Sequence, residues 1–200
     1  MGEVVQYDLF GNPIEDKPKK DWSGDTHSVF VTVGASNHSK GERQNEDFYA
    51  SHPEAGEWLM RLEKFEGPIW EPCCGQGHLA RVFESHGYEV RSTDLIDRGY
   101  GEGGINFLDP RITEWNGAIV TNPPFAFAQE IIEKAISIIP MGQKVAMFLR
   151  TLFLEGQARR KLFDESPPKR VWVTSKRIVC AKNGDFEHNT GGEIGRASCR

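Results

Sequence analysis

Between residues 53 and 173, short apolar runs alternate with segments in which apolar residues recur every three or four positions. Short runs bounded by turn residues predict buried strands at 68–70, 89–93, 117–120, 144–149 and 171–173. The period of about 3.6 residues predicts helices at 53–64, 79–86 and 125–139. Strands that alternate with helices predict an α/β fold, with a doubly wound, mostly parallel sheet covered on both faces.

The first predicted helix should turn Trp58, Leu59 and Leu62 inward, and Gly87 is a natural C-cap for the second. A chain of 200 residues can bury the core of one such domain. We expect this folded domain to span 47–186.

Residues 1–46 are polar with little periodicity, apart from a strand-like run at 28–33, and predict a mostly flexible leader. Within this leader Gln6, Leu9 and Phe10 resemble the short peptide with which bacterial replication proteins bind the sliding clamp. A free tail with two apolar anchors and one amide can bind a preformed groove. The alternative is that Leu9 and Phe10 pack onto the domain.

A strand ending at Glu71 is followed by a Gly75-x-Gly77 turn, a helix, a second strand and Asp94. This is the layout of a nucleotide-binding βαβ unit, in which glycines let the backbone approach a ligand and the acid binds ribose hydroxyls. Ala80 replaces the third glycine of the dinucleotide fingerprint, which opposes a nicotinamide dehydrogenase. A carboxylate at Glu71 would repel phosphates but suits a cationic amino group, as S-adenosylmethionine carries. The alternative is that both acids are ordinary solvated strand-end residues.

A second motif, Asn122-Pro123-Pro124-Phe125, follows the predicted strand at 117–120. The Asn side-chain oxygen and the next carbonyl are two acceptors for the two N–H bonds of an exocyclic amine. The prolines fix the backbone, and the aromatic ring offers a stacking face. The alternative is a simple turn after a strand.

Together, these segments resemble the class I S-adenosylmethionine-dependent methyltransferases, and within them the small DNA adenine-N6 methyltransferases of phages and prophages. The resemblance covers 45–186 and makes 47–186 the methyltransferase catalytic domain. It implies S-adenosylmethionine as cofactor, and an adenine-specific DNA methyltransferase in which the target base is flipped out of the duplex. The catalytic motif is then Asn122, Pro123, Pro124 and Phe125.

The resemblance also assigns the cofactor site. It places the methionine end of the cofactor at Tyr49 and Ser51, and it implies that further contacts come from the glycine motif and the strand ends: Glu71, Cys73, Gly75, Gly77, Asp94, Leu95, Asn106 and Phe107. Asn106 stands where the family has Asp, although an amide can still bond adenine N6. Two rival functions remain open: methylation of a glutamine amide, as in release-factor methyltransferases, and a catalytically silent, truncated binding module.

The net charge of −5 argues against a surface coated by nucleic acid, but 151–182 carries eight basic and three acidic residues. Phosphate contacts are expected there, from Arg159, Arg160, Lys161, Lys176 and Arg177. The alternative is a solvated helix face with charged loops.

Cys73 and Cys74 are adjacent and no Cys-x-x-Cys occurs, so we expect neither a disulfide nor a metal site. No apolar run is long enough to cross a membrane, and a cytoplasmic protein is expected. Residues 187–200 do not resemble the aromatic strand with which the family continues. They look like a translated adapter joined to a broken gene, and we expect a non-native or truncated tail that leaves the closing strand missing.

Overall fold

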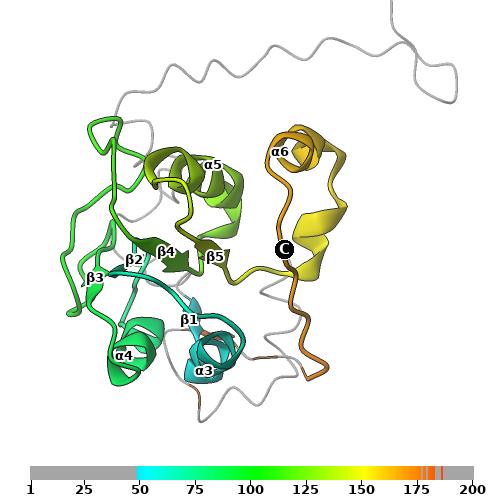
Figure 1. Ribbon diagram of the computed structural model, residues 1–200. Helices are drawn as coiled ribbons and strands as arrows, with labels where there is room; N and C mark the ends of the chain where they lie inside the picture. Colours follow the sequence, from blue (N-terminus) through cyan, green and yellow to red (C-terminus); the bar gives the residue numbers. More distant parts are fainter. Residues whose placement is uncertain (1–48, 177, 179, 183–185, 187–200) are drawn as a thin grey trace, which may run out of the picture.

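The computed structural model describes residues 49–176, 178, 180–182 and 186 (Figure 1). The predicted leader, its clamp-type peptide and the predicted tail all lie outside the described residues, as does Arg177. In the described part of the chain, no helix is long and apolar enough to span a membrane.

Four parallel strands form the central sheet, in the order β3-β2-β4-β5. They are β2 (Ile69–Glu71), β3 (Val90–Ser92), β4 (Ala118–Thr121) and β5 (Val145–Met147). The chain runs outward from β2 to β3 and then crosses back to β4, so the strand order reverses between β2 and β4. The predicted doubly wound, mostly parallel α/β sheet is therefore confirmed, and the ends of β2 and β4 flank the point where such folds bind ligands.

The helices cover both faces of this sheet (Figure 1). On one side lie α3 (Pro53–Leu62) and α4 (His78–Ser85), and on the other lies α5 (Ala128–Ile138), which follows a 3-10 turn, η1 (Phe125–Phe127). Successive strand residues point to opposite faces. Ile69 accordingly joins the core beneath α3 and α4, whereas Trp70 joins the core beneath α5.

A separate two-stranded antiparallel sheet pairs β1 (Tyr49–Ser51) with β6 (Cys180–Lys182). Strand β1 leads directly into α3, which begins with Pro53 at its first position. The His52 ring caps the helix, because its Nδ1 accepts a hydrogen bond from the Glu54 backbone at 3.2 Å. The cap and the proline together fix where α3 starts.

The inward face of α3 differs from the prediction. Leu59 packs against the core, but Trp58 and Leu62 are each 42% exposed. The helix instead turns Ala55 and Gly56 inward. A Cβ at Gly56 would lie only 3.1 Å from Val82 of α4, so the two helices approach closely at this glycine. That close approach sets the rotation of α3 and leaves Trp58 and Leu62 at the surface.

After β5, residues 150–176 form an outlying layer, drawn in yellow and orange on the right-hand side of Figure 1. It contains two 3-10 turns, η2 (Thr151–Glu155) and η3 (Gln157–Arg159), and the short helix α6 (Arg160–Glu165). The strand predicted at 171–173 is wrong, because this stretch pairs with no strand of the described residues and its side chains are exposed. Trp172, within the stretch, and Arg170, just before it, instead donate hydrogen bonds to the Glu63 side chain.

Candidate functional site

A small cavity lies at the carboxyl ends of β2 and β4. Its lining comes from β1, the end of β2, the glycine turn, the start of α4 and the residue after β4: Ala50, Ser51, Glu71, Cys73, Cys74, His78, Leu79 and Asn122. The two motifs predicted from the sequence thus share one hollow. Four predicted site residues, Ser51, Glu71, Cys73 and Asn122, line it directly.

Glu71 is the most buried charged side chain of the described chain, with 2% of its surface exposed. Burial raises its pKa well above the ordinary value, and the nearby Asp94 carboxylate raises it further, while a backbone contact at Ala80 opposes the shift. One carboxyl oxygen, Oε2, has no hydrogen-bond partner among the described residues. A buried acceptor without a donor is costly, so this position favours a ligand that brings a cationic donor.

The glycine turn is shaped by positive φ angles of 56° at Gly75 and 78° at Gly77. A Cβ at Gly77 would collide with the Tyr100 ring, which packs over the turn. Gly77 is therefore required by the close approach of a protein side chain as well as by its backbone angle. Of the two cysteines, Cys73 has a thiol pKa above its usual range through burial and then Asp94. Burial followed by Glu71 raises the pKa of Cys74 to about 12, so both thiols are neutral near pH 7.

Asp94 does not line the cavity but lies at the glycine turn behind it. Its two carboxylate oxygens accept hydrogen bonds from the backbone of Gly75, at 2.8 Å, and Ile96, at 3.0 Å. The carboxylate thus organises the turn, and each of its oxygens keeps a further lone pair that can accept a hydrogen bond. Leu95, the next residue, is half-buried.

Asn122 follows β4 and is held by a residue far away in the sequence. Its Nδ2 donates a hydrogen bond to the Ser51 hydroxyl oxygen at 2.8 Å, and Ser51 is itself buried. With the amide nitrogen engaged, the opposite oxygen, Oδ1, is the atom that can accept from a ligand. The following Pro123 is buried and Pro124 is exposed, and the Pro124 carbonyl accepts from Phe127 to start the 3-10 turn.

Phe125, three residues after Asn122, does not line the cavity and has 42% of its surface exposed. The Arg150 guanidinium lies over its ring, 4.1 Å from the centroid. Two Arg150 nitrogens, Nε and Nη2, are buried and find no acceptor within the described part of the chain. Phe125 and Arg150 therefore place an aromatic ring beside a cation whose Nε and Nη2 donors have no acceptor among the described residues.

Two predicted cofactor residues, Asn106 and Phe107, do not line the cavity. Phe107 is buried in the core against Trp70, with ring centroids 5.1 Å apart, and the half-buried Asn106 accepts from the backbone of Leu108. Tyr49 lies in β1, opposite Lys182. Their predicted contacts with a cofactor stay predictions.

Four of the five predicted phosphate-binding residues lie in the outlying layer, and the fifth, Arg177, is outside the described residues. Arg160 and Lys161 are exposed and form ion pairs within α6, with Asp164 at 3.4 Å and Glu165 at 3.8 Å. Arg159 donates to the backbone carbonyls of Leu152 and Phe153. Lys176 is exposed.

Several lining residues were absent from the sequence prediction. The main one is His78, the first residue of α4, whose pKa is lowered by burial and then by Arg81. The first helical position after a glycine turn regularly faces the ligand of a βαβ unit, so this position could have been found.

The cavity volume is about 20 Å³, room for one water molecule. A nucleoside-sized ligand must therefore displace side chains around the cavity, and one lining residue, His78, contacts Phe186 edge-on with ring centroids 5.1 Å apart.

No family model and no curated protein matches the chain. Among solved structures it is similar to the glycopeptide N-methyltransferase MtfA, determined in complex with (S)-adenosyl-L-homocysteine. The similarity covers 80% of this chain and 70% of that chain, with 13% sequence identity and a TM-score of 0.41. A likeness at this level assigns neither a cofactor nor a substrate to this chain. The fold and the cavity define a doubly wound α/β protein with a candidate ligand site at its strand ends.

Proposed function

We propose that this chain is an S-adenosylmethionine-dependent methyltransferase that acts on N6 of adenine in DNA, with 47–186 as its catalytic domain. One observation carries the proposal: the Asn122 amide, oriented by Ser51, lines the same cavity as the buried Glu71. The Asn122 amide can accept a hydrogen bond from an amine, and the Glu71 carboxyl suits a cationic ligand.

The residues at the end of β2 fit the proposed cofactor. The partnerless Glu71 oxygen can accept a hydrogen bond from the ammonium group of an amino-acid tail. A cation beside it would lower the pKa of this carboxyl and restore its negative charge. Asp94, at the glycine turn, has lone pairs left for ribose hydroxyls. When bound, S-adenosylmethionine supplies an electrophilic methyl group on a positively charged sulfur.

The residues after β4 fit the proposed substrate. Asn122 Oδ1 and the Pro123 carbonyl accept the two N6 hydrogens of an adenine, which aims the nitrogen lone pair away from both acceptors. Phe125 stacks on the ring, since nearly half of its surface is exposed. These groups act by positioning and by stabilising the positive charge that develops on N6. In a duplex, the adenine must first leave the base stack.

Methylation of a glutamine amide is the principal rival, because an amide nitrogen also presents two hydrogens to Asn122. The basic excess of the outlying layer favours DNA, since a negatively charged polymer is held by such a surface. A direct comparison decides between them. The full chain is incubated with cofactor carrying a labelled methyl group and either unmethylated DNA or a glutamine-containing peptide. Label in the peptide alone overturns the assignment.

A binding module without catalysis is separated by thermal shift and by one variant. A competent methyltransferase is stabilised by S-adenosylmethionine and not by nicotinamide cofactors. The Asn122→Ala variant should lose methyl transfer by roughly two orders of magnitude or more while keeping the cofactor-induced shift. Asn116→Ala, at an exposed position in the turn before β4, is the matched control and should keep both transfer and the cofactor-induced shift. Loss of both transfer and cofactor binding in Asn122→Ala would mean that its role is structural.

A further inference from the structure

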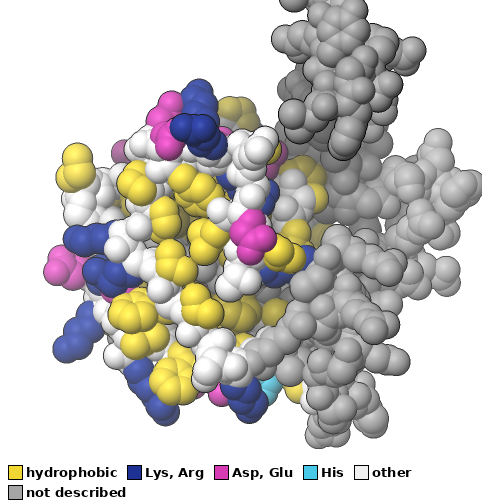
Figure 2. All heavy atoms as spheres, turned by 90° about the vertical axis from the view of Figure 1, so that its right-hand side faces the viewer, with side chains coloured by type: hydrophobic (Ala, Val, Ile, Leu, Met, Phe, Trp, Pro, Cys, Tyr) yellow, Lys and Arg dark blue, Asp and Glu magenta, His cyan; other side chains and the backbone are white. Residues whose placement is uncertain are grey.

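The side of the molecule that carries the outlying layer exposes a cluster of large apolar side chains. Figure 2 looks onto this side and shows hydrophobic side chains gathered over it, with Lys and Arg side chains around them. From the layer itself, this apolar strip consists of Leu152, Leu154, Val171, Trp172 and Val173, each at least 44% exposed. A contiguous exposed group of this kind marks a binding surface.

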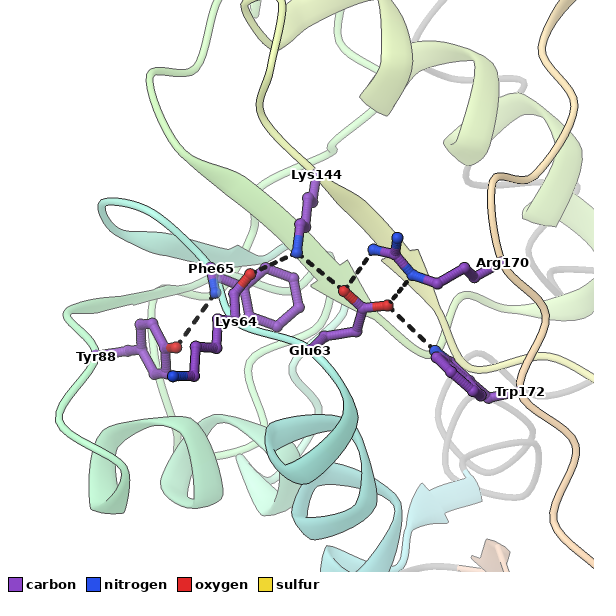
Figure 3. Close-up of polar contacts among 7 residues, drawn as sticks. All are labelled: Glu63, Lys64, Phe65, Tyr88, Lys144, Arg170 and Trp172. Carbon is purple, nitrogen blue, oxygen red and sulfur yellow. Dashed lines mark hydrogen bonds and ion pairs between the residues drawn. The ribbon is translucent and has the colours of Figure 1, made fainter.

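Trp172, in the apolar strip, is exposed yet fixed in position. It keeps 52% of its surface exposed, while its indole nitrogen donates to Glu63 Oε1 at 3.2 Å (Figure 3). Arg170 pairs with both oxygens of the same carboxylate, and Lys144 donates to it at 2.9 Å. Glu63 thus ties the strip to the end of α3 and the start of β5. An aromatic ring held in this way loses little conformational freedom when a ligand stacks on it.

The charge around the apolar strip favours a polyanion. Residues 150–176 carry seven Lys and Arg side chains and three Asp and Glu, in a chain whose net charge is −5. Two of these acids, Asp164 and Glu165, pair with cations inside α6, so they do not cancel the charge of Lys169 or Lys176. The surface therefore combines exposed cations with stacking and apolar area.

The outlying layer is also connected to the segment that follows Asn122. The layer begins at Arg150, whose guanidinium lies on the exposed Phe125 ring. Two residues before the layer, just after β5, the Phe148 backbone N–H donates a hydrogen bond to the carbonyl of Thr121, which precedes Asn122. A chain-like ligand with a group in the cavity can therefore extend over Phe125 and Arg150 onto the layer.

We propose that this surface binds a nucleic-acid strand with unpaired bases, and that Trp172 is a stacking platform for one of them. The inference rests on the proposed function in taking nucleic acid as substrate, and adds that the enzyme engages it in single-stranded form. A duplex presents phosphates to the cations but hides its base faces from Trp172. A single strand offers both, and stacking on an aromatic side chain is tolerant of sequence.

Equilibrium binding of a labelled oligonucleotide tests this directly. Fluorescence anisotropy compares a single strand of about 16 nucleotides with the duplex of the same sequence. The full chain should bind the single strand more tightly. Trp172→Ala should weaken that binding by roughly 5- to 150-fold, the range of one lost stacking contact, whereas Trp172→Phe should retain most of it. Trp58→Ala removes a comparably exposed tryptophan from α3 and should leave the affinity unchanged.

Charge is tested separately by salt. For Lys169→Ala, the slope of log affinity against log salt should become shallower by about 0.7, the contribution of one phosphate contact to a single strand. Trp172→Ala should leave that slope unchanged. Melting temperatures close to that of the unmodified chain show that the variants are folded.

The outcomes separate this inference from the proposed function, because the titration measures no methyl transfer. The inference is overturned if the duplex binds more tightly than the single strand, or if Trp172→Ala binds as tightly as the unmodified chain. It is also overturned if no oligonucleotide binds, and that outcome would point to a protein partner for the apolar strip. If the chain binds single strands through Trp172 but methylates no DNA, the inference is supported and only the proposed function is overturned.

Discussion

Asn122 and Ser51 are 71 residues apart in the sequence, yet the amide nitrogen of one lies 2.8 Å from the hydroxyl oxygen of the other. Asn122 directly follows β4, an inner strand of the parallel sheet, and Ser51 ends a strand of the small antiparallel sheet. The contact decides which end of the Asn122 amide faces the cavity. It makes Ser51 a positioning residue for the atom that is proposed to accept the substrate amine.

Replacing Ser51 with Ala should therefore impair turnover more than cofactor binding. Loss of one neutral hydrogen bond costs about 1 kcal/mol, so kcat should fall by roughly five- to tenfold as the amide loses its orientation. The S-adenosylmethionine affinity, measured by calorimetry, should stay within about twofold. Ser85→Ala, which removes a hydroxyl bonded to the Val82 carbonyl, is the control. A fall in affinity with kcat unchanged would instead place Ser51 against the cofactor, as the family resemblance implies.

Glu71 should make the stability of the ligand-free protein decrease with pH. Its folded pKa is raised, so the folded state keeps a proton that the unfolded chain releases near the ordinary value of 4.5. The free energy of unfolding then falls as the pH rises from about 4.5 toward the folded pKa. Glu71→Gln removes this penalty. Its melting temperature should match that of the unmodified chain near pH 4 and exceed it at pH 7.

The same variant should lose the stabilisation by S-adenosylmethionine, because a neutral amide no longer pairs with an ammonium group. Glu66→Gln, at an exposed position, should change neither the pH profile nor the ligand response. Parallel pH profiles for Glu71→Gln and the unmodified chain would show that Glu71 is ionised in the folded protein.

Two glycine substitutions separate backbone strain from steric collision. Gly77 and Gly104 have nearly equal φ angles of 78° and 77°, but an added methyl group meets the Tyr100 ring at the first and nothing within 4 Å at the second. Gly104→Ala should lower the free energy of unfolding only by the strain of a left-handed backbone, about 1–2 kcal/mol. Gly77→Ala should cost clearly more in chemical denaturation. Equal losses would mean that Tyr100 moves aside at little cost.

Glu63 should stabilise the fold at neutral pH and lose that effect in acid. Hydrogen bonding from Arg170, and then from Lys144 and Trp172, lowers its pKa to about 2 against the opposing effect of burial. Because the folded pKa is depressed, the stabilisation is complete above about 4.5 and disappears as the pH falls toward about 2. Glu63→Gln should be destabilised by about 1–3 kcal/mol at pH 7 and much less near pH 2.

The control for Glu63 is Glu57→Gln, which removes a more exposed carboxylate that pairs with His86. An exposed pair of this kind contributes at most about 1 kcal/mol. An equal loss of stability in the two variants would contradict the central role of Glu63.

Features encoded by neighbouring residues were predictable from the sequence. The strand at Ile69–Glu71, the glycine turn and the α4 helix follow from local periodicity and from two glycines, and Gly87 ends that helix with a φ of 85° as expected. The shared cavity of Glu71 and Asn122 follows from topology, because parallel strands that flank a reversal of strand order end at the same edge.

Features that depend on distant partners were not predictable. Residues 171–173 have the composition of a strand, but a strand also needs another strand to pair with. Here Glu63 instead accepts hydrogen bonds from Trp172 and from Arg170. The surface position of Trp58 follows from the close contact between Gly56 and Val82 on another helix. Neither contact leaves a periodic signal in the sequence.

Helix α3 has an unusual pair of neighbours. Ser51, which orients the Asn122 amide, lies two residues before its start, and Glu63, which grips Arg170 and Trp172, lies immediately after its end. Its ten residues form a stiff rod about 15 Å long. Because one stiff helix joins the two positions, we expect a shift of Glu63 along the helix axis to move Ser51 as well.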